Sequence, residues 1–225
     1  MSFSNTNTGS QDADPYTSKN QQEPSLQEKV EDLKTFIDKN KFCLLTTKNT
    51  EGLLVSRAMA LAAKVRSVSL VQFAAPRTAE TDPHKQEGNG IDLIFHTNTE
   101  SGKTDDLDAN AQINVGFLNN SGEWASFSGP ATVETDRAKV REYYSPALKA
   151  WLGDLGDGKH DGGPEDPRIG LIKIKTSTVT YATSAKNFVT STIEVVKGAV
   201  TGETPSVNKL RHLSEQEVQQ WRSSS

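Results

Sequence analysis

The chain has 225 residues, and its 25 lysines and arginines against 29 aspartates and glutamates give a formal net charge of −4. Nucleic-acid-binding proteins usually carry a basic face, and the sequence holds no lysine- and arginine-rich run. It has no apolar stretch of about 18 residues that could span a membrane, and no signal- or transit-peptide pattern at its start. The single cysteine, Cys43, lies in an apolar run, where we expect a small core residue rather than a nucleophile. These features predict a soluble, cytoplasmic protein.

The first predicted helix follows a polar start. Residues 1–24 are rich in Ser, Asn, Thr, Gln and Asp, which predicts a disordered tail. Ser25 and Glu28 have the spacing of a capping box, in which the two side chains satisfy free N–H groups of a first helical turn. Apolar residues then repeat at helical spacing and predict a helix as far as about Asn40.

The remaining pattern is mainly that of strands joined by turns. Strands are predicted at 42–47, 53–62, 91–97, 113–118, 124–134 and 169–181. Other segments are predicted as helices at 102–110, 136–144, from Ser145-Pro146 onward and at 187–200, as a loop at 154–166, and as a polar C-terminal tail at 206–225. The sequence therefore predicts an α+β domain at 25–205, mainly antiparallel, in which a small β-barrel carries peripheral helices.

The stretch from Phe95 to Lys103 carries the strongest indication of chemistry. A predicted strand ends there in a turn rich in hydroxyl groups, and Gly102 and Lys103 begin a helix. Hydroxyls, loop N–H groups and a lysine at a helix start suit a phosphate, although a solvated turn with a capping serine has the same composition. Gly102-Lys103-Thr104 also matches the end of a nucleoside-triphosphatase loop. We reject that alternative, because Thr97 stands where the motif needs its first glycine and the flanking hairpins do not suit that fold.

Several blocks of the sequence occur in an order that is typical of one family. They are Ser56-Arg-Ala-Met59, Phe95 to Lys103, Trp124 to Glu134, Tyr144 to Leu152 and Lys197 to Pro205. Together they resemble the pyridoxamine 5′-phosphate oxidase-like, FMN-binding split-barrel family, in its general stress protein branch. Within that branch the chain resembles the fungal blue-light-inducible group. The resemblance covers about residues 25–205 and implies a split β-barrel.

The resemblance implies a flavin, FMN or FAD, held between the subunits of a homodimer. The cofactor-binding positions that it implies are Arg57, Ala58, Met59, Thr97, Asn98, Ser101, Lys103, Trp124, Ser126 and Trp151. By the family's motif, Arg57, Thr97, Ser101 and Lys103 hold the flavin phosphate, while the backbone from Ala58 to Ala60 borders the isoalloxazine ring. Trp124 and Ser126 are expected near the ring or ribityl chain, and Trp151 over the ring.

Physical arguments bear on these positions separately. Arg57 is predicted to face inward among apolar neighbours, which is costly without an anion and favours a phosphate. The two tryptophans are also compatible with ordinary core or interface packing, and this alternative stays open. The four histidines have no spacing of a metal site. His96 alternates away from Thr97, so we expect it at an exposed or interface position.

One segment departs from the family. Residues 64–87 separate the predicted strand of Arg57 from that of Phe95, where the resemblance implies a short turn. We interpret this segment as an insertion outside the barrel. One hypothesis is an intron translated in error, which an mRNA that retains the segment would refute.

Two functional hypotheses follow. The first is a flavin-dependent oxidoreductase of unidentified substrate, in which the flavin carries the redox chemistry. The second is a flavin-binding stress or sensor protein without turnover. Pyridoxamine phosphate oxidase activity itself is not expected, because the basic residues that would bind its substrate phosphate are not found near the C-terminus. A related barrel that binds haem or deazaflavin is a weaker alternative, because no histidine is placed as an axial ligand.

Overall fold

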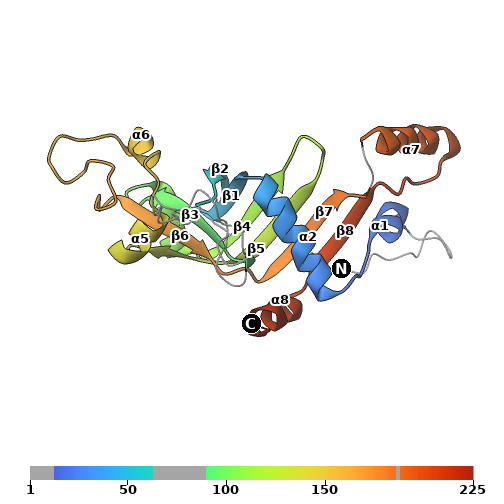
Figure 1. Cartoon of the computed structure of the whole chain (residues 1–225), viewed down its shortest axis with the longest axis horizontal. Helices are drawn as coiled ribbons and strands as arrows, with labels where there is room; N and C mark the ends of the chain where they lie inside the picture. Colours follow the sequence, from blue (N-terminus) through green and yellow to red (C-terminus); the bar gives the residue numbers. More distant parts are fainter. Residues whose placement is uncertain (1–12, 63–89, 186–187, 225) are drawn as a thin grey trace, which may run out of the picture.

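The computed structural model describes residues 13–62, 90–185 and 188–224. These residues form an antiparallel sheet of eight strands that curls into a half-barrel, with helices around it (Figure 1). The predicted fold class, a mainly antiparallel α+β split barrel with peripheral helices, is confirmed. The insertion predicted at 64–87 lies outside the described residues.

Most predicted elements are present within a few residues of their expected bounds. The strands are β1 (Phe42–Lys48), β2 (Leu54–Ala60), β3 (Leu93–Asn98), β4 (Gln112–Leu118), β5 (Trp124–Glu134), β6 (Ile169–Ile174), β7 (Thr178–Ser184) and β8 (Asn208–Leu213). The helices are α1 (Pro15–Asn20), α2 (Leu26–Lys39), α4 (Gly102–Ala109), α5 (Arg137–Tyr143), α6 (Leu148–Leu152), α7 (Phe188–Thr201) and α8 (Glu215–Ser223). Across the described ranges, no helix combines the length and apolar character needed to cross a membrane.

The predicted strand at 169–181 is wrong in one respect, because it is two strands. β6 and β7 are separated by a short connection, and all of β6 except Lys173 is buried. One face of β6 belongs to the main core, while the other packs under α5 through Ile169 and Leu171. A strand that is covered on both faces loses the alternation expected of a half-exposed strand.

The long strand β5 belongs to two parts of the sheet. Its first half pairs with β4 on one side and β7 on the other, and from Ala131 it pairs with β6. The sheet order is β2-β1-β4-β5-β6-β3, with β7 and β8 branching from β5. At the branch, a Cβ on Gly129 would lie 2.1 Å from the Lys175 carbonyl oxygen. Only glycine allows the two backbones to approach this closely.

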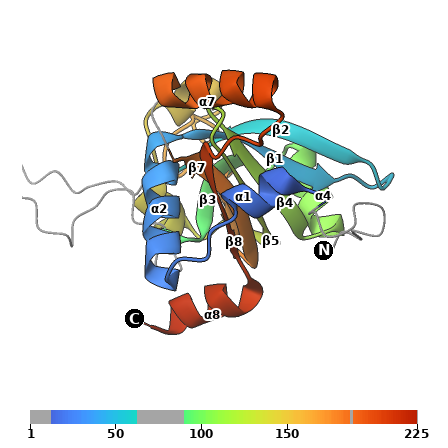
Figure 2. The same ribbon diagram turned by 90° about the vertical axis from the view of Figure 1, so that its right-hand side faces the viewer.

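The inner face of the sheet packs against α2, which lies along one side of the sheet (Figure 2). Phe36 of α2 meets Phe117 of β4 edge to face at a ring-centroid distance of 6.2 Å, and Phe117 meets Phe127 of β5 at 5.7 Å. A second, smaller core lies between α5 and the β3–β6 pair and includes Val140 and Ile94. α5 and α6 therefore lie at one end of the molecule, while α1 and α7 lie at the other (Figure 1).

The opposite side of β2, β1, β4 and β5 stays exposed, and we call it the outer face. It is defined by the alternate side chains Phe42, Leu44, Leu54, Leu118 and Ser126. The four apolar members are 52% to 75% exposed. A sheet face with this much exposed apolar surface is typical of an interaction surface.

The prediction of a polar C-terminal tail at 206–225 is wrong. The segment contributes β8, which pairs with β7, and α8, whose Val218 is completely buried. Lys29 of α2 donates to Glu217 of α8 at 2.8 Å, and Arg211 of β8 donates to Glu28 of α2 at 2.8 Å. Lys29 and Glu217 are thus paired in space although they are 188 positions apart in the sequence. Glu28 therefore completes an ion pair rather than the predicted capping box, of which only the Ser25 half is present.

The predicted disordered tail at 1–24 is wrong for its described part, from residue 13 onward. α1 ends at Asn20, whose buried side-chain oxygen accepts hydrogen bonds from the N–H groups of Val207 and Asn208, both at 3.0 Å. The N–H of Gln22 donates to the Leu210 carbonyl at 3.0 Å. These contacts fasten a polar segment to β8, and local composition gives no sign of them.

The close approach at Gly129 predicts a large cost for any side chain there. We expect Gly129→Ala to lower the free energy of unfolding by about 2–3 kcal/mol, because the new methyl group would force the backbone of Lys175 away. Gly116→Ala is the matched control, since no atom lies within 4 Å of the position that its Cβ would take and its φ is not positive. Guanidinium unfolding of the two variants measures the difference. Equal midpoints would show that the branch tolerates a side chain.

Candidate functional site

The turn between β3 and α4 is built by Asn98. Its side-chain oxygen accepts from the N–H of Glu100 at 2.9 Å, and its carbonyl accepts from the Ser101 hydroxyl at 2.6 Å. Ser101 is the N-cap residue of α4, but its side chain makes no capping bond. Instead the Ser101 oxygen accepts from Nζ of Lys103 at 2.8 Å. The turn therefore places a hydroxyl and an ammonium group together at the start of α4.

Arg57 reaches this region from β2. Its Nη1 donates to Oδ2 of Asp106 at 2.9 Å and to Oγ1 of Thr47 at 2.8 Å, and Thr47 also donates to Asp106 at 2.8 Å. Thr47 and Asp106 are both buried. The sequence argument that Arg57 needs a phosphate as its anion is therefore corrected, because the Asp106 carboxylate of α4 is already its partner. Neither Asp106 nor Thr47 was among the predicted site residues.

The electrostatics at the start of α4 nevertheless favour an anion. Burial lowers the pKa of Lys103, and the neighbouring Arg57 guanidinium lowers it further. Lys103 and Arg57 are therefore close enough for their charges to repel, and the Asp106 carboxylate pairs with Arg57. The N-terminus of α4 adds free N–H groups and the positive end of the helix dipole. A phosphate dianion would fit this charge distribution, held by Arg57, Ser101 and Lys103.

Two other predicted cofactor-binding residues, Thr97 and Asn98, have structural roles at the end of β3. Thr97 is buried, and its hydroxyl donates to the adjacent Asn98 carbonyl at 3.1 Å. Its methyl group lies 3.4 Å from the position that a Cβ of Gly170 would take in β6. Asn98 uses its side chain to form the turn. The structure thus brings together Arg57, Ser101 and Lys103, while Thr97 and Asn98 fix the end of the strand that carries the turn.

β2 offers a backbone edge beside this cationic cluster. Within the described part of the chain, β2 pairs with β1, and beyond its end a single bridge joins Leu61 to Phe95 of β3. The hydrogen bonds at the two ends of the hairpin, Asn49 N–H to Leu53 and Leu61 N–H to Lys41, fix the alternation of the ladder. In this alternating pattern the N–H and C=O of Met59 point toward β1, whereas the N–H and C=O of Ala58 point away from β1. Of these two predicted ring-edge residues, Ala58 fits the role.

Trp124 and Ser126 are not brought to this cluster within one chain. They lie on the outer face of β5, half-buried, and Ser126 accepts from the Asn114 amide at 2.7 Å. β1 and β4 lie between β5 and β2 in the sheet. At the usual spacing of neighbouring strands, β5 and β2 are therefore about 14 Å apart. Arg57 contacts groups on the inner side of the sheet.

Trp151 lies near Ala60, the last residue of β2. It belongs to α6 and lines a cavity of about 670 Å³ together with Ala60, His96 and Tyr144. Its side chain is 88% exposed. The structure therefore places Trp151 next to the end of the strand that carries Arg57 and Ala58.

Comparison with known proteins gives the family. The family model described as "Pyridoxamine 5'-phosphate oxidase like" matches residues 78–206, which include Ser101 and Lys103. The chain belongs to this family. Arg57 lies before the matched range and is assigned from the geometry described above.

Relatives in the family extend the match. The chain is 51% identical over 225 residues to protein bli-3 of Neurospora crassa, covering 99% of this chain and 97% of that one. Among solved structures, a protein of Jannaschia sp. CCS1 assigned as general stress protein 26 is 18% identical, with a TM-score of 0.52 over 84% of this chain and 99% of that chain. A pyridoxamine 5′-phosphate oxidase-related, FMN-binding protein of Nostoc punctiforme is 14% identical, with a TM-score of 0.46 over 72% and 86%. The general stress protein 26 relative supports the split-barrel fold.

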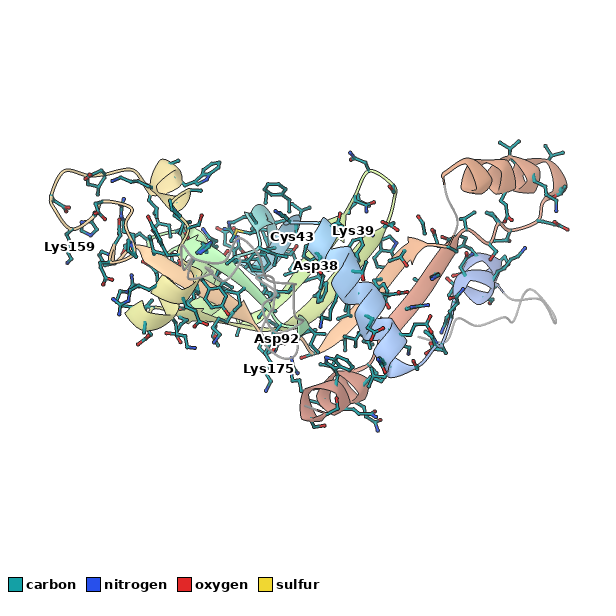
Figure 3. All side chains as sticks on the ribbon, in the orientation of Figure 1. Asp38, Lys39, Cys43, Asp92, Lys159 and Lys175 are labelled. Atoms are coloured by element: carbon teal, nitrogen blue, oxygen red, sulfur yellow. The ribbon has the colours of Figure 1, made fainter. Side chains whose placement is uncertain are left out.

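Cys43 takes no part in the site. It lies near the middle of the molecule, close to the end of α2 that carries Asp38 and Lys39 (Figure 3). Burial raises the pKa of its thiol to about 12, so the thiol stays protonated at neutral pH. The prediction of a small core residue is confirmed. In the described ranges no three His, Cys, Asp or Glu side chains are grouped to hold a metal.

A buried ion pair fixes the wall of the Trp151 cavity. Arg168 donates to both Asp166 carboxylate oxygens, at 2.6 and 3.1 Å, and to the carbonyls of Leu152 and Gly153, both at 2.9 Å. Arg168 thus caps the C-terminus of α6. The hydrogen bonds from Arg168 outweigh burial and lower the pKa of Asp166 to about 2.

This pKa predicts a pH-dependent stability. Because an unfolded aspartate has a pKa of about 3.9, the pair stabilises the fold by about 2 kcal/mol above pH ~5, and this is lost as the pH falls from about 4 to about 2. We expect Asp166→Asn to lower the free energy of unfolding by about that amount at pH 7, with the difference narrowing toward pH 2. Urea unfolding across this range measures it. Asp108→Asn, at an exposed position of α4, is the control. A difference that does not change with pH would contradict the assignment.

Proposed function

We propose that this chain binds FMN at the start of α4 and along β2, as a homodimer, and that it is a flavin-dependent oxidoreductase. The observation that carries the proposal is the pair of cations, Arg57 and Lys103, beside the Ser101 hydroxyl and the α4 N-terminus. Membership of the pyridoxamine 5′-phosphate oxidase-like family supports a flavin as the phosphate-bearing ligand.

Each residue of the cluster has a distinct task in this proposal. The flavin supplies the electron-transfer chemistry when it is bound. Lys103 and Arg57 neutralise its phosphate, with Lys103 acting as a point charge and Arg57 as a planar donor. Asp106 and Thr47 hold Nη1 of Arg57, so its remaining donors are oriented before the ligand arrives. Ala58 offers an N–H and a C=O to the ring edge.

A second copy of the chain would complete the site. Trp124 and Ser126 lie on the outer face of β5, whereas Arg57 of β2 contacts Thr47 and Asp106 on the inner side of the sheet. The exposed apolar side chains of Phe42, Leu44 and Leu118 make this face suitable for burial against another copy. We propose that Trp124 and Ser126 contact the flavin held by the partner.

The absorption spectrum of the purified protein tests the binding function. We expect bands of oxidised flavin, with FMN released on heating and identified by chromatography against FAD. Arg57→Ala/Lys103→Ala should remove the bands. Steady oxidation of reduced nicotinamide by the flavin-loaded protein tests the oxidoreductase function. Stable FMN binding without turnover would refute that part and leave a flavin-binding stress or sensor protein. A protein that binds neither FMN nor FAD would refute both.

The lowered pKa of Lys103 makes FMN binding pH-dependent. A phosphate favours the charged lysine, so above the lowered pKa the lysine must take up a proton on binding, and the FMN affinity falls as the pH rises. Lys103→Gln should weaken FMN binding about tenfold to hundredfold at pH 7.5 and remove this alkaline dependence. Lys139→Gln, on α5, is the matched control. Fluorescence titration of FMN between pH 7.5 and 10 measures both. The same slope in Lys103→Gln and wild type would contradict the assignment.

If the outer face forms the dimer interface, a single charge introduced on it should disrupt the dimer. We expect Leu44→Asp to give a monomer and to reduce FMN binding, because it places an unpaired carboxylate in a buried apolar interface. Leu155→Asp is the control, since Leu155 is comparably exposed but lies in the loop after α6. Sedimentation velocity with and without FMN measures the assembly. A dimer that survives Leu44→Asp would place the interface elsewhere.

A further inference from the structure

The cavity lined by Trp151 has the size of a small-molecule binding site. It measures about 670 Å³, within the range of roughly 300–1,000 Å³ typical of small-molecule sites. Its lining residues Leu148 and Trp151 belong to α6, which lies with α5 at one end of the molecule (Figure 1). Its walls come from the end of β2, from β3 and from the segment 141–151, and they include Ala60, Leu61, His96, Tyr144, Leu148 and Trp151.

His96 lines the cavity and carries a hydrogen-bond acceptor. Its Nε2 lies 2.7 Å from the Tyr143 carbonyl, which can only accept, so Nε2 carries the hydrogen. Burial lowers the pKa of His96, although the contact with Tyr143 acts in the opposite direction, so the ring is neutral at physiological pH. Nδ1 then has a lone pair, and it has no hydrogen-bond partner among the residues that the structure describes. The exposed position predicted for His96 is corrected, because the residue is half-buried and contacts Tyr143 of α5.

Apart from Ser145, the remaining uncharged walls are apolar or aromatic, and the lining carries no unpaired charge within the described chain. Tyr144 turns its hydroxyl away to the Gly162 carbonyl at 3.0 Å, which leaves its ring for the cavity. Arg141 is the only charged residue of the lining, and it already pairs with Glu165 at 2.6 Å. Trp151 exposes a large aromatic surface beside them. Arg168 donates to the Leu152 and Gly153 carbonyls at the C-terminus of α6. The wall that α6 contributes is therefore formed before any ligand binds.

We infer that this cavity binds an uncharged, planar aromatic molecule that donates one O–H or N–H hydrogen bond to Nδ1 of His96. A phenol or hydroquinone has this chemistry. The aromatic walls favour stacking, the paired Arg141 gives an anion no advantage, and the neutral imidazole selects a donor. Because Ala60 closely follows Ala58 on β2, the ligand would lie beside the strand that we propose borders the flavin, at a site distinct from it.

Two matched probes test the inference on the full chain by isothermal titration calorimetry. 2-Naphthol carries the donor, and 2-methoxynaphthalene has the same ring system without it. We expect 2-naphthol to bind more tightly than 2-methoxynaphthalene. His96→Gln keeps a donor for the Tyr143 carbonyl but removes Nδ1, so it should weaken 2-naphthol about tenfold and leave 2-methoxynaphthalene unchanged. His212→Gln, at an exposed position of β8, should change neither affinity.

A second variant keeps the test independent of the folding of His96→Gln. Trp151→Ala alters a highly exposed side chain and should weaken both probes. Equal affinity of the two probes for the wild type, no measurable binding of either, or equal effects of His96→Gln and His212→Gln would overturn the inference.

Repeating the titrations with saturating FMN separates this inference from the proposed function. Unchanged 2-naphthol binding supports a site distinct from the flavin. Displacement of 2-naphthol by FMN would assign the cavity to the flavin ring and overturn the inference. A protein that discriminates the probes but binds no flavin would refute the proposed function and leave this site intact.

Discussion

The backbone of Gly129 in β5 lies against the backbone of Lys175, where β6 ends. This contact lets one strand pair with β4 and β7 over its first half and with β6 over its second. The curl that results wraps the inner face around α2 and turns β3 and β6 toward α5. It leaves the outer face bare and opens the cavity beside α6. The cationic cluster, the outer face and the cavity therefore occupy different parts of one curled sheet.

Charge pairing decides how the cationic cluster can act. Arg57 is held by Asp106 and Thr47, so its burial requires no ligand. Lys103 is different: it donates to the neutral Ser101 hydroxyl, and burial together with the nearby Arg57 guanidinium disfavours its charge. An anion at the start of α4 relieves that repulsion without removing Asp106. The Arg57–Asp106 ion pair thus keeps the Arg57 side chain in position, while the Lys103 ammonium favours binding of an anion.

Much of the fold and part of the site could be predicted from sequence. Strand alternation, the Ser25 cap and the turn at Asn98 depend on residues within a few positions of one another, so their patterns survive in the sequence. The motif from Phe95 to Lys103 identified the start of α4 in the same way. Asp106 and His96 were missed because their roles depend on neighbours from other elements. Alternation places His96 opposite Thr97, but it does not show that α5 covers that side.

The sequence by itself determined most of the strands and helices, because local spacing and capping encode them, and its motifs indicated the family. Tertiary structure alone decided which distant groups meet. Lys29 pairs with Glu217 and Arg57 with Asp106, while Trp151 reaches the end of β2. It also converted two segments predicted as tails into parts of the fold. The physical reason is that ion pairs and cavity walls are properties of chain topology, and the contribution of a charged residue depends on the partner that the fold brings to it.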